Sequence, residues 1–245
     1  MNKPLYIRST GAQGCNSNES CGKQLAGSTC IKEGTYAGLC DPGEKTFAGT
    51  PLNMTDAVRQ HIIDMHNYRR SRLAQGLVPN GTTGKRLPAG TDIAQLKYNM
   101  ELERAAQAYA NNCPTGLSSV ASRPGTGEIY QSLPSNKLAI MDVISRALKA
   151  SWHPVWIVGF SDTLEFVQRL EETPNAPIMF TQMAWGNTTE VGCGAARCSS
   201  NTTVICRYNP RGNTVGQKIY TPGKTCSKCP NGCTTAFLYK GLCLD

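Results

Sequence analysis

The stretch that decides the fold is MFTQMAWGNTTEVGCGAARCSSNTTVICRYNPRGN, residues 179–213. Its first seven residues carry apolar or hydroxyl side chains at every second position, which is the period of a strand. Two further short strands are predicted at 190–196 and 203–208, and turn-forming residues separate the three segments. Pro210 and Gly212 then end the last strand. The stretch therefore predicts a three-stranded antiparallel meander.

Two motifs in this stretch resemble the signatures of the CAP superfamily (cysteine-rich secretory proteins, antigen 5, pathogenesis-related 1). The first is MFTQMAW at 179–185, where the family normally begins with histidine, and the second is CRYNPRGN at 206–213, which is complete. Upstream, HNYR at 66–69 and RPGTGE at 123–128 also fit. Four ordered motifs are far more specific than any one of them. The resemblance implies an α+β fold, a three-layer α-β-α sandwich, and is strongest to venom-allergen-like proteins that parasitic nematodes secrete.

Helices are expected before and beside the sheet, in agreement with an α+β fold. The first begins after Thr55, a good N-cap residue, and ends at Gly76. The others are predicted at 100–112, 137–152 and 163–171. Apolar residues at helical spacing give the first and third helices a buried face: Val58, Ile62, Met65 and Leu73, then Met141, Ile144, Leu148 and Trp152.

The composition favours a secreted protein. The chain has 245 residues, and it holds 12 cysteines with no run of eighteen apolar residues, so it is not expected to be an integral membrane protein. The N-terminus lacks the apolar core of a signal peptide, so that peptide has either been removed or never existed, and the cysteines favour removal. Five sequons agree with an extracellular location and predict glycosylation at Asn18, Asn53, Asn80, Asn187 and Asn201.

The cysteines divide the chain into a cysteine-rich N-terminal extension at 1–50, a CAP domain at 51–220 and a hinge-like segment at 221–245. The two ends share the pattern C-x5-Y-x-G-L-C at 30–40 and 233–243. The resemblance implies the bridges Cys113–Cys198, Cys193–Cys206, Cys226–Cys233 and Cys229–Cys243, and the repeat extends them to Cys15–Cys30 and Cys21–Cys40. A zinc knuckle at 226–229 is the rival interpretation, but the second cysteine pair lacks the matching short spacing.

Members of the family commonly hold two histidines and two glutamates in a central cleft that can bind a divalent cation. The corresponding positions here are Met179, Leu117, Glu128 and Val155, so only Glu128 keeps a ligand side chain. No metal, no cofactor and no catalytic residue is therefore expected. We interpret Glu128 as a structural carboxylate held by backbone donors of its glycine-rich turn, and His66 as a hydrogen-bonded packing residue.

The function expected from the resemblance is that of a secreted, non-enzymatic lipid-binding protein released by a parasite, with a sterol or a fatty acid as ligand. The matching loop is rich in apolar residues: Trp152, Trp156, Phe160, Leu164 and Phe166. The alternative for these rings is a place in the core.

A second possible function is binding to a host receptor or a surface polyanion, since the net charge is +8. The basic residues at 69–72 and 85–86 form either a solvated face or such a site. Nucleic acid is not an expected partner of a secreted chain.

Overall fold

The computed structural model describes residues 29–30, 40–41 and 48–244. The chain forms two compact units, residues 1–47 and 48–245. In the first unit β1 (Thr29–Cys30) pairs antiparallel with β2 (Cys40–Asp41). The bridges predicted for Cys15 and Cys21 and the glycan predicted at Asn18 involve residues outside the described part.

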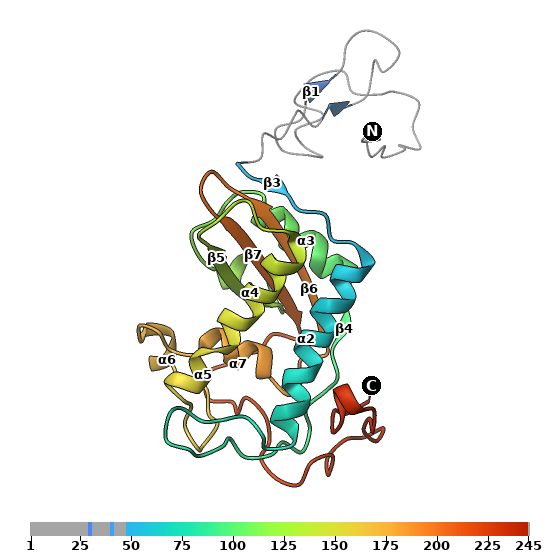
Figure 1. Cartoon of the computed structure of the whole chain (residues 1–245), viewed down its shortest axis with the longest axis vertical. Coiled ribbons are helices and arrows are strands. Elements are labelled where there is room, and N and C mark those ends of the chain that lie inside the picture. The colour runs from blue at the N-terminus through green and yellow to red at the C-terminus, as the bar shows by residue number, and fades with distance from the viewer. Residues whose placement is uncertain (1–28, 31–39, 42–47, 245) are drawn as a thin grey trace. The chain divides into compact units, whose positions relative to one another are not determined.

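The second unit is built on a sheet of five strands in the order β3-β6-β7-β5, with β4 paired to β6 (Figure 1). The long strands are β5 (Gly127–Leu133), β6 (Glu190–Arg197) and β7 (Thr202–Asn209), and β7 is antiparallel to both β5 and β6. The short strands are β3 (Thr50–Pro51) and β4 (Lys97–Tyr98). The strands predicted at 190–196 and 203–208 are thus confirmed.

The strand predicted at 179–185 is wrong, because this segment forms helix α7 (Ile178–Ala184). Residues 180–184 are all buried, so the helix has no polar face to reveal a period near 3.6. The alternation of apolar side chains was therefore accidental. The third long strand is β5, whose first residues were expected to form a turn around Glu128, and it pairs with β7 instead of with β6, which is the next long strand in the chain. The predicted meander of three consecutive strands is therefore also wrong.

Helices cover both faces of the sheet. Thr55 caps the first helix, since its Oγ1 accepts a hydrogen bond from the Val58 amide. The helix expected at 163–171 forms only at its C-terminal end, as α6 (Arg169–Glu172). Met141, which was expected on the buried face of the third helix, is exposed. The helices are α2 (Asp56–Ala74), α3 (Met100–Ala110), α4 (Ile140–Trp152), α5 (Pro154–Ile157) and α6 (Arg169–Glu172), with 3-10 turns η1 (Val120–Ser122) and η2 (Phe237–Tyr239).

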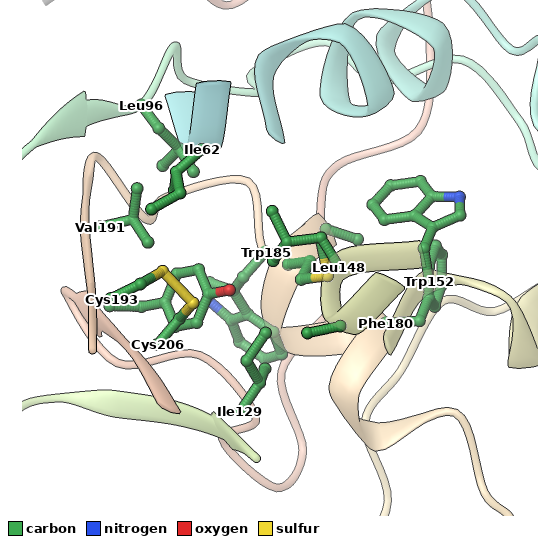
Figure 2. Close-up of a cluster of buried hydrophobic side chains, with 14 of the residues drawn as sticks. Ile62, Leu96, Ile129, Leu148, Trp152, Phe180, Trp185, Val191, Cys193 and Cys206 are labelled. Atoms are coloured by element: carbon green, nitrogen blue, oxygen red, sulfur yellow. A yellow bond between two sulfur atoms is a disulfide. The ribbon is translucent and has the colours of Figure 1, made fainter. Parts of the chain in front are cut away.

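The alternation of side chains along β6 separates the two helical layers. Gly192, Gly194 and Ala196 face α3, whose backbone lies so close that a Cβ on either glycine would overlap it. Val191 and Cys193 face the other way, into the larger core shared with α2, α4 and α7 (Figure 2). The protein is therefore the α-β-α sandwich that the sequence predicts.

Candidate functional site

The two signature motifs hold each other in place beside β5. The Thr181 hydroxyl donates to Asn213 Oδ1 at 2.8 Å, and the side-chain nitrogen Nδ2 of Asn213 donates to the carbonyl of Ile178 at 2.9 Å. Gln182 Oε1 accepts a hydrogen bond from the Gly212 amide at 3.1 Å. The motifs therefore work as a structural clamp between α7 and the exit of β7.

Arg70 on α2 is fully buried, and its guanidinium fixes the end of α7. It donates to the carbonyls of Ala94, Met183, Trp185, Gly186 and Thr188 at 2.7–3.1 Å. The carbonyls at the end of a helix lack intrahelical partners and carry partial negative charge, so they suit a cation. Burial lowers the pKa of Arg70 to about 9. The interpretation of residues 69–72 as one solvated or polyanion-binding patch is wrong, because Arg70 faces the interior.

His66 lies one turn before Arg70 and is also fully buried. Its Nδ1 lies 2.7 Å from the carbonyl of Ile62, and its Nε2 lies 2.9 Å from the hydroxyl of Tyr208. Burial lowers the pKa of His66 to about 3. Both ring nitrogens are thus engaged in a neutral ring, in agreement with a packing role rather than metal ligation.

Glu128 is held by side chains and by one backbone amide of a neighbouring loop. Its carboxylate accepts from the amide and hydroxyl of Ser118 at 2.7 and 3.0 Å and from Arg207 Nε at 3.1 Å. Arg123 Nε lies 3.9 Å away. Both carboxylate oxygens are therefore engaged, although the donors are not those of its own turn as expected.

The other three cleft positions carry apolar side chains in different surroundings. Leu117 is partly exposed next to Ser118, Val155 is fully buried, and Met179 packs against the main core. Among the described residues, no three His, Cys, Asp or Glu side chains gather in a way that could hold a metal ion. The described part of the chain thus offers no donor set that fits the divalent cation of the family.

Most of the apolar residues assigned to a lipid loop belong to the core. Trp152 lies edge-on to Phe180 with ring centroids 4.8 Å apart, and Phe166 lies edge-on to Trp185 at 6.3 Å. Leu164 is likewise fully buried. These three members of the predicted loop, Trp152, Leu164 and Phe166, therefore do not form a surface for lipid in this conformation.

A short apolar ridge remains exposed at the end of α5. Trp156 is 40% exposed, Ile157 55% and Val158 59%. These three consecutive side chains are here called the α5 edge. The half-buried Phe160 follows and packs toward Phe180, with ring centroids 6.5 Å apart. Ile157 and Val158 are not among the residues predicted for the lipid loop, because that prediction rested mainly on aromatic rings.

Asn80 clasps the segment after α5. Its Oδ1 accepts from the Phe160 amide at 2.6 Å and its Nδ2 donates to the Phe160 carbonyl at 3.0 Å. Gly159 has a φ of +76°, and a Cβ there would lie 2.8 Å from Asn80 Oδ1, so glycine is required for this approach. Asn80 therefore fixes the backbone of the segment after α5 in place.

The predicted glycosylation sites differ in how accessible their asparagine side chains are. A glycan is attached to the side-chain nitrogen of asparagine, and the nitrogen of Asn80 is buried and engaged in this clasp. Asn201 is half-buried and donates to the Ser132 hydroxyl at 2.6 Å. Asn53 and Asn187 are exposed. Of these four sequons, Asn53 and Asn187 offer the more accessible side chains.

Four disulfides join described cysteines in the pairs that the resemblance implied. Cys193–Cys206 links the adjacent strands β6 and β7, and Cys113–Cys198 ties the segment after α3 to the end of β6. The other two close the C-terminal segment, through Cys226–Cys233 and Cys229–Cys243.

Comparison with known sequences identifies close relatives among secreted proteins. The model of the cysteine-rich secretory protein family (CAP) matches residues 63–208. The Ancylostoma secreted protein of Ancylostoma caninum is 32% identical over 99% of this chain and 56% of that protein. The cysteine-rich venom protein of Tityus serrulatus is 30% identical over 84% of this chain and 50% of that protein. The chain thus spans about half the length of these two relatives.

Comparison with solved structures gives the same result for the fold. The crystal structure of NaASP2 with Zn2+ is 30% identical, with a TM-score of 0.71 over 80% of this chain and all of that one. Na-ASP-1 is 30% identical, with a TM-score of 0.72 over 95% of this chain and 58% of that one. None of the helices within the described residues has the length and apolar character that crossing a bilayer requires.

Proposed function

The chain belongs to the cysteine-rich secretory protein (CAP) family, and from this premise we propose that it is a secreted, non-enzymatic protein that binds an apolar lipid, a sterol or a fatty acid, at the α5 edge. An extracellular location is supported by relatives that are secreted and venom proteins. A lipid role is supported by the apolar surface at a segment that matches the lipid loop of the family.

The main observation behind the proposal is that three consecutive apolar residues are exposed next to a buried residue of the same turn. Trp156, Ile157 and Val158 point to solvent, while Val155 in the same turn is fully buried. A rigid apolar ligand needs flat apolar surface and few polar partners, and a tryptophan supplies such surface at low entropic cost. The non-enzymatic part of the proposal is supported by Glu128, whose oxygens are occupied by Ser118 and Arg207.

The proposal predicts that the double variant Trp156→Ala/Ile157→Ser binds a fluorescent sterol at least about tenfold more weakly. Covering about 100 Å² of apolar surface contributes roughly 2.5 kcal/mol, and the two side chains together offer at least this area. Sterol titration of the purified protein measures the loss, and thermal unfolding checks that the fold is intact.

Phe237→Ser is the matched control, because Phe237 is 92% exposed on η2 but lies outside the α5 edge. It should leave the affinity for sterol unchanged. Equal weakening by both variants would mean nonspecific adsorption to apolar surface, and unchanged binding by the double variant would remove the α5 edge as the site.

The exposure of Phe237 favours a second candidate function, recognition of a host protein by the C-terminal segment. Leu238 beside it is 48% exposed, so the tip of η2 presents two adjacent apolar side chains. Aromatic residues of this kind are enriched at the centres of protein interfaces. Binding to host cells that Phe237→Ser abolishes and the α5 edge variant preserves would establish this function instead.

A further inference from the structure

A hollow of about 250 Å³ lies where the C-terminal segment meets the body of the protein. Asp92 and Asn187 line it from loops of the body, while Lys228, Pro230 and Leu244 line it from the C-terminal segment. This segment ends beside α2 (Figure 1) and joins the body through main-chain hydrogen bonds between Cys243 and the loop at 93–95. The hollow is therefore a seam between two parts of the second unit.

Asn187 is the first residue of a sequon and stands at the rim of this hollow. The rest of the sequon is anchored, since the Thr188 hydroxyl donates to the carbonyl of Pro210 at 2.9 Å and the Thr189 amide donates to the carbonyl of Asn209 at 3.0 Å. The exposed Asn187 side chain is thus presented from a rigid turn, unlike the buried side chain of Asn80.

We propose that Asn187 carries an N-linked glycan whose first N-acetylglucosamine residue sits in the hollow and bridges the body to the C-terminal segment. The apolar face of the sugar ring would lie against Pro230 and Leu244. Its hydroxyl and amide groups would donate to the Asp92 carboxylate, and its oxygen atoms would accept from the Lys228 ammonium. The volume equals that of roughly eight waters at about 30 Å³ each, which is room for one sugar residue.

The covalent link makes such a site effective even though the hollow is open to solvent. A free sugar would bind weakly to so few groups, but attachment to Asn187 gives the sugar an effective concentration in about the millimolar range. Occupancy of the hollow then stabilises the docked position of the C-terminal segment, since a ligand stabilises the state that binds it. The inference requires passage through the secretory route, and it is independent of lipid binding.

Hydrogen exchange on protein secreted from eukaryotic cells tests the bridge. Two amides form hydrogen bonds across this junction: that of Cys243 donates to the carbonyl of Ile93, and that of Gln95 donates to the carbonyl of Cys243. Both should exchange roughly threefold faster or more in Asn187→Gln than in the wild type. Thr189→Ala, which removes the glycan without changing Asn187, should have the same effect. Asn53→Gln, at an exposed sequon away from the hollow, should leave these amides unchanged.

Enzymatic release of the glycan provides the second readout. Peptide-N-glycosidase should free the Asn187 glycan much more slowly from the native protein than from the reduced and unfolded protein, because the linkage is shielded. Mass spectrometry of the Asn187 peptide measures occupancy and release. An unoccupied Asn187, equally rapid release from native and unfolded protein, or unchanged exchange in both sequon variants would each overturn the proposal.

Discussion

Arg70 and His66 lie four residues apart on one face of α2, so their side chains are neighbours, and burial deprives both of water. The two side chains replace their lost hydrogen bonds to water in different charge states. Arg70 keeps its charge by donating to five carbonyls, whereas His66 stays neutral between a carbonyl and the Tyr208 hydroxyl. Arg70, which was expected in a basic surface cluster at 69–72, is thus a polar element of the core beside His66.

Replacing Arg70 by lysine should destabilise the protein strongly. A single ammonium cannot reach the carbonyls on α7 and the loop at 94 together, so several buried acceptors lose their donors. We expect a loss of about 3 kcal/mol or more in the free energy of unfolding, measured with urea. Arg72→Lys, at an exposed position on the same helix, should change it by less than about 0.5 kcal/mol. Similar losses in both variants would contradict the role assigned to Arg70.

His66 should make the protein sensitive to acid. Below pH 6.5 the unfolded chain binds a proton at this side chain that the folded protein does not bind until about pH 3. Stability is therefore lost as the pH falls through this window, by at most about 1.4 kcal/mol per pH unit from this group. Urea unfolding between pH 4 and 6 gives the free energy of unfolding as a function of pH. This free energy should fall less steeply with falling pH in His66→Gln than in the wild type, whereas His153→Gln, at an exposed position, should keep the wild-type pH dependence. Equal pH dependence in all three would refute the assignment.

At the scale of elements, segments marked by a capping residue or by turns at their ends were predictable, even where they are buried, and a buried helix without such signals was not. The start of α2 followed from Thr55, and the strands β6 and β7 followed from the turns around them. Helix α7 escaped prediction because its buried residues leave no helical period, and the buried state of Leu164 depends on pairing with residues near 219, far away in sequence. Of the candidate site, sequence predicted the lost cleft ligands but could not distinguish core rings from exposed ones.

The contact between α3 and β6 depends on glycines, which gives a test at this scale. A Cβ at Gly194 would overlap the backbone of Gln107, and a helix backbone cannot move aside as a flexible side chain can. Gly194→Ala should therefore destabilise the protein by about 3 kcal/mol or more. Gly116→Ala has open space around the new methyl group and should be nearly neutral in urea unfolding. A neutral Gly194→Ala would show that the two layers are less tightly packed than the structure indicates.

The C-terminal segment is part of the second unit at the scale of the whole molecule. Thr225 Oγ1 donates to the carbonyl of Ala74, and Ser71 Oγ donates to the carbonyl of Lys240, so both ends of the segment bind α2. The hydroxyl of Tyr239 also donates to Asp64 on this helix. Residues 221–245 were expected to form a separate hinge-like segment, since short cysteine-rich segments are stabilised by disulfide bridges rather than by a core. Both of its disulfides join cysteines within the segment, but its side chains pack against α2 and the body of the second unit.

A substitution at Leu242 tests whether the C-terminal segment unfolds together with the body or independently of it. Leu242 is fully buried and belongs to the main core, although it lies between the cysteines of the terminal repeat. Leu242→Ala should lower the free energy of unfolding by about 2–5 kcal/mol, as expected for a core leucine. Leu238→Ala on the same segment is the control, and because Leu238 is 48% exposed we expect a much smaller change. If the segment shares the core, Leu242→Ala moves one cooperative transition to lower urea, reported equally by tryptophan fluorescence from the body and by hydrogen exchange at 226–244. An autonomous segment would instead lose exchange protection at 226–244 while the fluorescence transition stayed in place.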